Sequence, residues 1–150
     1  MAINYIPQIM HNGVYGPNNV GDTYKPAPYH GVAAKRKKEK ARWAHPSSCE
    51  YYVFNLADEH DDSIDENGMQ DLKWMNDDGR GLYSLVDDCK ERLGQEGERL
   101  AFFPTPVNAN DPWHGYPIDS TNVGDNLILY WYRKRVISES TYLRLMRHRL

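Results

Sequence analysis

The sequence predicts an α+β protein in which a small β-sheet is packed by one amphipathic helix and followed by a C-terminal helical hairpin. Two short runs rich in aromatic and β-branched residues, 50–56 and 99–103, indicate the strands. Apolar residues at helical spacing over 82–93 indicate the helix between them. At 150 residues and 40% hydrophobic content, one modest core is expected. We divide the chain into an N-terminal arm with a basic cluster, 1–42, and a single small domain, 43–150.

The N-terminal arm is predicted to be extended or disordered, because four prolines and four glycines interrupt any regular period over 1–42. Its tyrosines are unusual in a solvated linker, so we expect them to lie against an apolar surface of the domain or of a partner. Six of the eight residues over 35–42 are basic and could contact phosphates or face an acidic surface. The arm residues expected to bind a partner are Tyr15, Tyr24, Tyr29, Lys35, Arg36, Lys37 and Lys38.

The domain is expected to begin with the strand at 50–56, which lies between a Pro-Ser-Ser turn and a run of acidic residues. The helix over 82–93 then follows and ends at Gly94, a common residue just past a helix C-terminus. Cys89 lies on its apolar face, which favours a small buried hydrophobe over a reactive thiol. The strand at 99–103 completes a strand, helix, strand order, in which the helix covers one face of the sheet.

Two helices are expected in close succession at the C-terminus. Asp125 or Asn126 can cap the first helix, and Ser138 can cap the second. A strand over 127–132 is the alternative for the first, but three basic residues at 133–135 suit the C-terminal end of a helix dipole. The pair is therefore predicted to form a helical hairpin.

This hairpin carries basic residues that could bind a partner, among them Arg144 and Arg147. One interpretation is a helix-turn-helix that presents its second helix to a nucleic-acid groove. That motif needs a third supporting helix and usually a glycine in its turn, and the sequence between the two helices contains no glycine. A hairpin docked on the domain, with its basic residues in water, is the favoured interpretation.

The formal net charge of −3 hides three segments of larger charge. Residues 1–57 hold seven basic and three acidic side chains. Residues 58–98 hold four basic and fourteen acidic side chains, and residues 99–150 hold seven basic and four acidic ones. Such segregation indicates either an anionic partner for the basic ends or an internal arrangement in which they face the acidic middle. The internal arrangement is favoured, because a strongly basic domain would be the better sign of nucleic-acid binding.

The most distinctive segment of the chain is 111–119. Its nine residues include two prolines, a glycine, two aromatic rings and a histidine. As a packed connector, it would place Trp113 and Tyr116 at the edge of the core. As a ligand or partner site, it would add Trp113, His114 and Tyr116 to the partner-binding residues. As a catalytic site, it would use His114 as general acid or base, oriented by Asp111 or Asp119.

Other classes of function lack a supporting pattern. The longest apolar run, 127–132, is far below the roughly 20 residues of a membrane span, and the N-terminus lacks the features of a secretory signal. A cytoplasmic location is therefore expected, with Cys49 and Cys89 as reduced thiols.

The acidic run 58–68 does not fit the calcium-loop template, because Trp74 falls where a glutamate is required. No metal or cofactor is predicted.

Together these observations favour a non-catalytic binding or regulatory module that engages a macromolecule, preferably a protein, through its aromatic arm and basic ends. The first alternative is a small hydrolase or transferase that acts through His114. The second alternative is a nucleic-acid-binding protein that uses the C-terminal hairpin. No membrane partner is expected, and the oligomeric state does not follow from the sequence.

Overall fold

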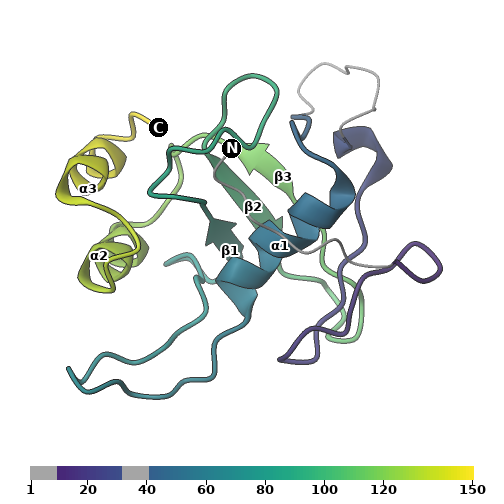
Figure 1. Ribbon diagram of the computed structural model, residues 1–150, viewed down its shortest axis with the longest axis horizontal. Helices are drawn as coiled ribbons and strands as arrows, with labels where there is room; N and C mark the ends of the chain where they lie inside the picture. The colour runs from purple at the N-terminus through teal and green to yellow at the C-terminus, as the bar shows by residue number, and fades with distance from the viewer. Residues whose placement is uncertain (1–9, 32–40) are drawn as a thin grey trace.

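Figure 1 shows the computed structural model of the protein, which describes residues 10–31 and 41–150. A three-stranded sheet lies at the centre, helix α1 crosses it, and helices α2 and α3 lie together beside it. The α+β class predicted from the sequence is confirmed. In chain order the elements are η1 (Pro28–His30), α1 (Ser47–Asp58), β1 (Gly81–Ser84), β2 (Leu100–Pro104), β3 (Tyr116–Ile118), α2 (Asp125–Arg133) and α3 (Glu139–Met146).

The sheet is antiparallel, with strand order β1-β2-β3. Phe102 in the middle strand pairs with Tyr83 on one side and with Tyr116 on the other. The strand expected at 99–103 is thus confirmed as β2. Pro117 lies in β3 at the edge of the sheet, where a residue without an amide proton is tolerated and discourages pairing with another chain.

Helix α1 occupies the place of the strand expected at 50–56, and that prediction is wrong. Glu50, Val53, Phe54 and Ala57 are buried, and intervals of three and four residues place them on one face of a helix. The aromatic and β-branched composition of this run favours a strand by local propensity. Packing of the apolar face against the sheet outweighs that propensity, because it buries the large Phe54 ring beside strand β2.

The prediction of an amphipathic helix over 82–93 is also wrong. The helix that packs on the sheet is α1. Residues 81–84 form strand β1 and are all buried. After β1 the backbone turns with positive φ angles of 52°, 56° and 62° at Asp87, Asp88 and Cys89, which a right-handed helix does not allow. Cys89 is nevertheless buried, as expected, and in the described structure it is not joined to Cys49 by a disulfide.

The C-terminal helical hairpin is confirmed by α2 and α3. The expected cap of α3 is correct, since the Ser138 hydroxyl accepts the backbone N–H of Thr141 at 3.2 Å. The cap expected for α2 at Asp125 or Asn126 is wrong, because the residue in the N-cap position is Gly124. The carboxylate of Asp77, which lies outside the helix, accepts N–H groups of its first turn instead.

The described part of the N-terminal arm packs into the same core as the sheet. Tyr24 is completely buried, and its ring centroid lies 5.3 Å from that of Phe54 and 5.9 Å from that of Phe103. Tyr15 is also buried and stacks on Tyr51 at 5.0 Å. The expectation that these two tyrosines bind an external partner is therefore corrected, because the protein's own helix and sheet cover both rings.

Candidate functional site

The residues expected to bind a partner lie in three parts of the chain: the N-terminal arm, the segment around His114 and the C-terminal hairpin. Tyr15 and Tyr24 are in the core, as described above. Tyr29 remains exposed over 40% of its surface. The basic residues Lys35, Arg36, Lys37 and Lys38 lie outside the described residues. The remaining candidates are in the segment around His114 and in the C-terminal hairpin.

His114 lines a shallow hollow of about 260 Å³ whose other walls come mainly from Pro26, Pro28 and Tyr29. Over the described ranges, no hydrogen bond joins His114 to Asp111 or to Asp119. Asp111 accepts a hydrogen bond from the Asn108 amide at 3.1 Å, and Asp119 accepts the Thr121 N–H at 3.0 Å. Both carboxylates thus stabilise their own turns, and neither orients the imidazole as a general base would require.

Trp113 is a core residue and not a contact surface. Its ring is 7% exposed and packs on Phe54, with 5.4 Å between ring centroids. Its backbone N–H donates to the Thr23 carbonyl, and its carbonyl accepts the Lys25 N–H, each at 2.8 Å. These contacts are those of the packed connector, which joins the N-terminal segment to the sheet.

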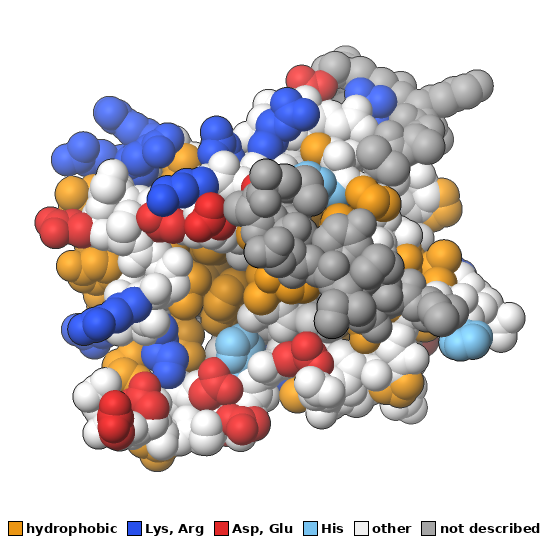
Figure 2. All heavy atoms as spheres, in the orientation of Figure 1, with side chains coloured by type: hydrophobic (Ala, Val, Ile, Leu, Met, Phe, Trp, Pro, Cys, Tyr) orange, Lys and Arg blue, Asp and Glu red, His pale blue; other side chains and the backbone are white. Residues whose placement is uncertain are grey.

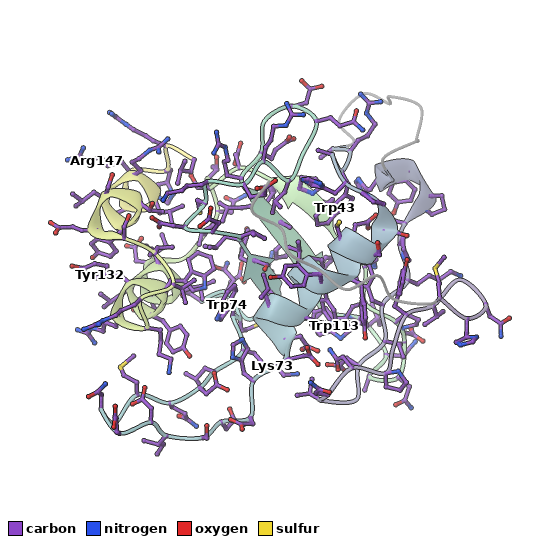
Figure 3. All side chains as sticks on the ribbon, in the orientation of Figure 1. Trp43, Lys73, Trp74, Trp113, Tyr132 and Arg147 are labelled. Atoms are coloured by element: carbon purple, nitrogen blue, oxygen red, sulfur yellow. The ribbon has the colours of Figure 1, made fainter. Side chains whose placement is uncertain are left out.

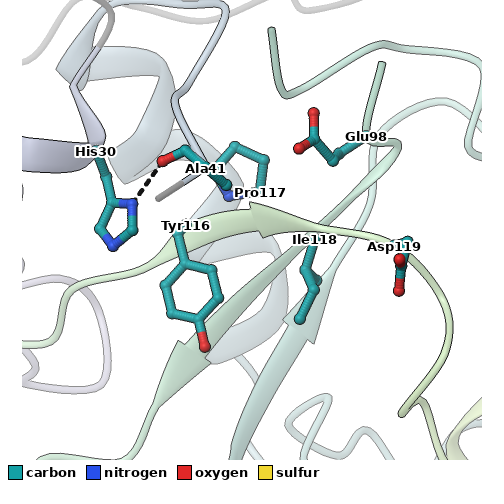
Figure 4. Close-up of a pocket in the computed structure, with 7 residues that line it drawn as sticks. All are labelled: His30, Ala41, Glu98, Tyr116, Pro117, Ile118 and Asp119. Atoms are coloured by element: carbon teal, nitrogen blue, oxygen red, sulfur yellow. Dashed lines mark hydrogen bonds between the residues drawn. The ribbon is translucent and has the colours of Figure 1, made fainter. Parts of the chain in front are cut away.

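Figure 4 shows a second hollow, of about 420 Å³, along strand β3. The His30 ring bonds the Ala41 carbonyl and stacks on the half-buried Tyr116, with 5.0 Å between ring centroids. The carboxylate of Glu98 accepts a nearby backbone N–H at 3.0 Å, and Asp119 does the same in its own turn. Because both carboxylates are engaged in local turns, the polar groups of this hollow do not converge on a common point.

Helix α3 presents the third surface. We call it the α3 face and define it by the residues that line a shallow hollow of about 480 Å³: Glu139, Ser140, Leu143, Arg144 and Arg147. Leu143 is 44% exposed, which is unusual for a leucine on a helix that already buries Leu145 on its opposite side. Arg144 and Arg147, both expected from the sequence, are exposed on this face. Figure 3 shows Arg147 on the side of α3 that points away from the sheet.

An aromatic pair extends this surface toward α2. Tyr132 of α2 is 37% exposed and stacks on Tyr142 of α3 with 4.7 Å between ring centroids. Figure 3 shows Tyr132 on the outer side of the hairpin, on the same flank of the molecule as Arg147. Leu143 and Tyr132 were not among the residues expected to bind a partner, because only basic residues of this segment were selected. The signal was present, since Leu143 falls between the inward positions of the helix.

The hairpin is the most basic part of the described structure. Residues 125–150 hold six arginines or lysines and two acidic residues. Lys134 pairs with Asp65 at 3.3 Å. Within the described ranges, the five arginines of this segment make no ion pair. Figure 2 shows basic side chains over α3 at the upper left and further basic side chains lower on the same side.

An acidic segment projects below the hairpin (Figure 1). We call residues 61–66 the acidic loop; it contains four carboxylates, and its Ile64 is 70% exposed. Hydrogen bonds from Ser63 lower the pKa of Asp61, and those from the backbone of Met69 and from Lys134 lower the pKa of Asp65. Both therefore stay ionised at neutral pH. In the part of the chain that the structure covers, no cluster of three or more ligating side chains could hold a metal ion.

Glu50 and Tyr24 form a pair of titratable groups inside the core. Glu50 is 1% exposed and accepts a hydrogen bond from the Tyr24 hydroxyl at 2.9 Å. Burial raises the pKa of Glu50 to about 8, although the bond from Tyr24 lowers it in part. No described hollow reaches this pair, so it serves the core and not a ligand.

Comparison with protein-family models, curated proteins and solved structures found no match to this chain. Over residues 10–31 and 41–150, none of the helices has the length and apolar character needed to cross a bilayer.

Proposed function

We propose that this protein is a non-catalytic binding module that engages an acidic protein segment through the α3 face. The observation that carries the proposal is the combination on this face of an exposed Leu143 with two arginines, Arg144 and Arg147, that have no ion-pair partner in the described structure. Arginine is well suited to carboxylates, because its planar fork can donate two parallel hydrogen bonds. An apolar residue beside such cations favours a segment that carries an apolar residue next to acidic ones.

A protein partner is favoured over nucleic acid by the charges around the start of α3. The Ser138 N–H, at the N-terminus of the helix, donates to the Asp88 carboxylate at 2.8 Å, and Glu139 follows directly. In a helix-turn-helix the N-terminal residues of the second helix approach the DNA. Two carboxylates at that position would repel phosphates, whereas a protein segment can meet the arginines further along the helix.

A binding role is favoured over catalysis because the groups needed for acid–base chemistry do not meet. His114 has no carboxylate partner in the described structure, and its hollow is lined mainly by prolines and a tyrosine. Glu50, whose pKa burial raises to about 8, is closed off in the core. Buried thiols at Cys49 and Cys89 fit a reducing compartment, so a cytoplasmic location remains part of the proposal.

A photo-crosslinking amino acid placed at Ser140 tests this function in cells that express the protein. Ser140 lies on the α3 face, and its side chain makes no hydrogen bond in the described structure, so the replacement leaves Leu143 and both arginines in place. The matched control carries the same group at Val107, which is 99% exposed on a different loop. We expect protein adducts from position 140 that disappear in an Arg144→Glu, Arg147→Glu background. Adducts with nucleic acid, or the same products from both positions, would overturn the proposal.

A further inference from the structure

We propose that the acidic segment bound by the α3 face belongs to a second copy of this chain, and that it is the acidic loop. This inference rests on the proposed function and names the partner of the same surface. The pairing is reciprocal: each copy inserts its acidic loop into the α3 face of the other. It forms a two-fold symmetric dimer with two equivalent contacts.

The acidic loop has the chemistry that the α3 face requires. Ile64 is an exposed apolar residue, and Asp62 and Glu66 lie two residues before and two residues after it. Both carboxylates are exposed, and neither side chain makes an ion pair or hydrogen bond in the described structure. The loop therefore offers an apolar side chain flanked by two available negative charges.

The α3 face carries the complement of this pattern. Leu143 can contact Ile64, while Arg144 and Arg147 can receive Asp62 and Glu66. The α3 face places two arginines beside its leucine, with Glu139 one turn earlier in the helix, and the acidic loop places two unpaired carboxylates on either side of its isoleucine. Contact between them would cover two exposed apolar residues and pair four charges that have no partner in one copy.

The arrangement of the two surfaces on one flank allows reciprocal pairing. Tyr130 of α2 donates from its hydroxyl to the Gln70 carbonyl at 3.0 Å and accepts the Leu72 N–H at 2.8 Å, and Lys134 pairs with Asp65 at 3.3 Å. These bonds hold the base of the acidic loop against α2. Figure 2 shows a group of acidic side chains at the lower left of this flank and a group of basic side chains, with acidic ones beside it, at the upper left. A two-fold axis between them brings each loop to the other copy's α3 face.

The expected association is weak and sensitive to salt. Two small contacts cover less surface than the interfaces of stable dimers. Their attraction comes in large part from exposed charges, which salt screens. We therefore expect a monomer–dimer equilibrium that shifts toward monomer as salt rises from about 50 mM to about 500 mM.

Sedimentation velocity on the full chain, from about 10 μM to about 1 mM at low salt, measures this equilibrium. The loop variant is Asp62→Asn, Glu66→Lys, in which asparagine suits the positive φ of 62° at position 62. The face variant is Arg144→Glu, Arg147→Glu. We expect each variant alone to lose dimer, and an equimolar mixture of the two to regain it, because both contacts of the mixed dimer then pair opposite charges. Asp111→Lys, a charge change outside both surfaces, should leave the dimer intact.

The outcomes separate this inference from the function on which it rests. A wild-type protein that stays monomeric over this range overturns the inference, and so does a dimer that the loop variant leaves unchanged. In either case, arginine-dependent protein adducts from position 140 would still support the binding module, with another protein as its partner. Adducts between two copies would support both. Circular dichroism of each variant establishes that a lost dimer does not reflect unfolding.

Discussion

The Asp77 carboxylate, in the turn before β1, accepts the backbone N–H of Leu127 in the first turn of α2 at 3.1 Å. Its second oxygen accepts the Asn126 N–H at 3.0 Å. Free N–H groups at a helix start are usually bonded by the preceding residue, but Gly124 in the N-cap position has no side chain. A methyl group on Gly124 would overlap the Asp77 carboxyl group. The glycine therefore makes room for a cap from 50 positions away, which joins the hairpin to the sheet.

Replacing Asp77 by alanine should destabilise the protein by about 1 kcal/mol, because two N–H groups of α2 lose their acceptor. Urea unfolding followed by circular dichroism measures the difference. Glu66→Ala, an exposed acid outside any cap, serves as the control and should change stability by less than about 0.5 kcal/mol. Equal effects of the two substitutions would contradict a capping role for Asp77.

Asp88 bonds the start of α3 in the same way and should make stability depend on pH. Partial burial raises its pKa, but hydrogen bonds from Ser138 and Thr141 outweigh this, so the pKa is lowered on folding. Its contribution is present above the pKa of the unfolded chain, about 3.9, and is lost as pH falls through the lower folded pKa. Asp88→Asn should cost up to about 1 kcal/mol at pH 7 and nothing in strong acid. Urea midpoints of both proteins from pH 7 downward check this; a constant difference would contradict it.

Glu50 should give stability a pH dependence opposite to that of Asp88. Its pKa is raised on folding from 4.5 to about 8, mainly by burial. The folded protein thus binds a proton that the unfolded chain releases, so stability falls as pH rises between these two values and then levels off. Glu50→Gln keeps an acceptor for Tyr24 without the charge. It should raise stability at pH 8 by on the order of 2 kcal/mol and flatten the profile.

Thermal unfolding of wild type and Glu50→Gln across pH 5 to 9 would measure this difference. Tyr24→Phe is the companion variant, because it removes the donor and leaves the carboxyl buried. It should be less stable than wild type throughout. Parallel pH profiles for wild type and Glu50→Gln would show that Glu50 does not titrate in this window.

Lys73 should matter more for stability than an exposed lysine does. Its ammonium lies 2.9 Å from Oδ1 of the fully buried Asp58, and no hydrogen bond in the described structure reaches that oxygen. Lys73→Met would leave the carboxylate unpaired and cost about 2 to 4 kcal/mol. Lys90→Met, at an exposed position, is the control. Adding Asp58→Asn to Lys73→Met should recover part of the loss in chemical denaturation; a further loss would contradict the ion-pair argument.

Some elements of the fold could be predicted because their signals are local. Ser138 caps a helix three residues before the N–H that it binds, and β2 is a short aromatic run ended by a proline. The burial of Cys89 followed from its apolar neighbours, although the helix assigned to it was wrong. Arg144 and Arg147 are exposed, while their role in binding stays a prediction.

The errors came from segments whose local preference disagrees with their tertiary contacts. Tyr24 looked like part of a partner-binding arm because prolines and glycines surround it, but its ring fills the space between α1 and β2. Leu82 begins an apolar pattern of helical spacing, yet its strand pairs with β2 and is buried on both faces. In each case the local pattern is present in the sequence, but the structure that the segment adopts depends on the residues that it contacts in the fold.

Short-range signals in the chain were thus sufficient to predict the α+β class, the C-terminal hairpin and one strand. Caps, turns and apolar runs give such signals because they act within a few residues. Long-range packing selected the helix at Ser47–Asp58, the enclosure of Tyr15 and Tyr24, and the cap that Asp77 provides for α2. The physical reason is one of magnitude. Burying a large ring or pairing a free backbone N–H changes the free energy of folding by about 1 kcal/mol or more. Strand and helix propensities differ by less than about 1 kcal/mol per residue. Where the two disagree, contacts between residues distant in the chain outweigh local preference.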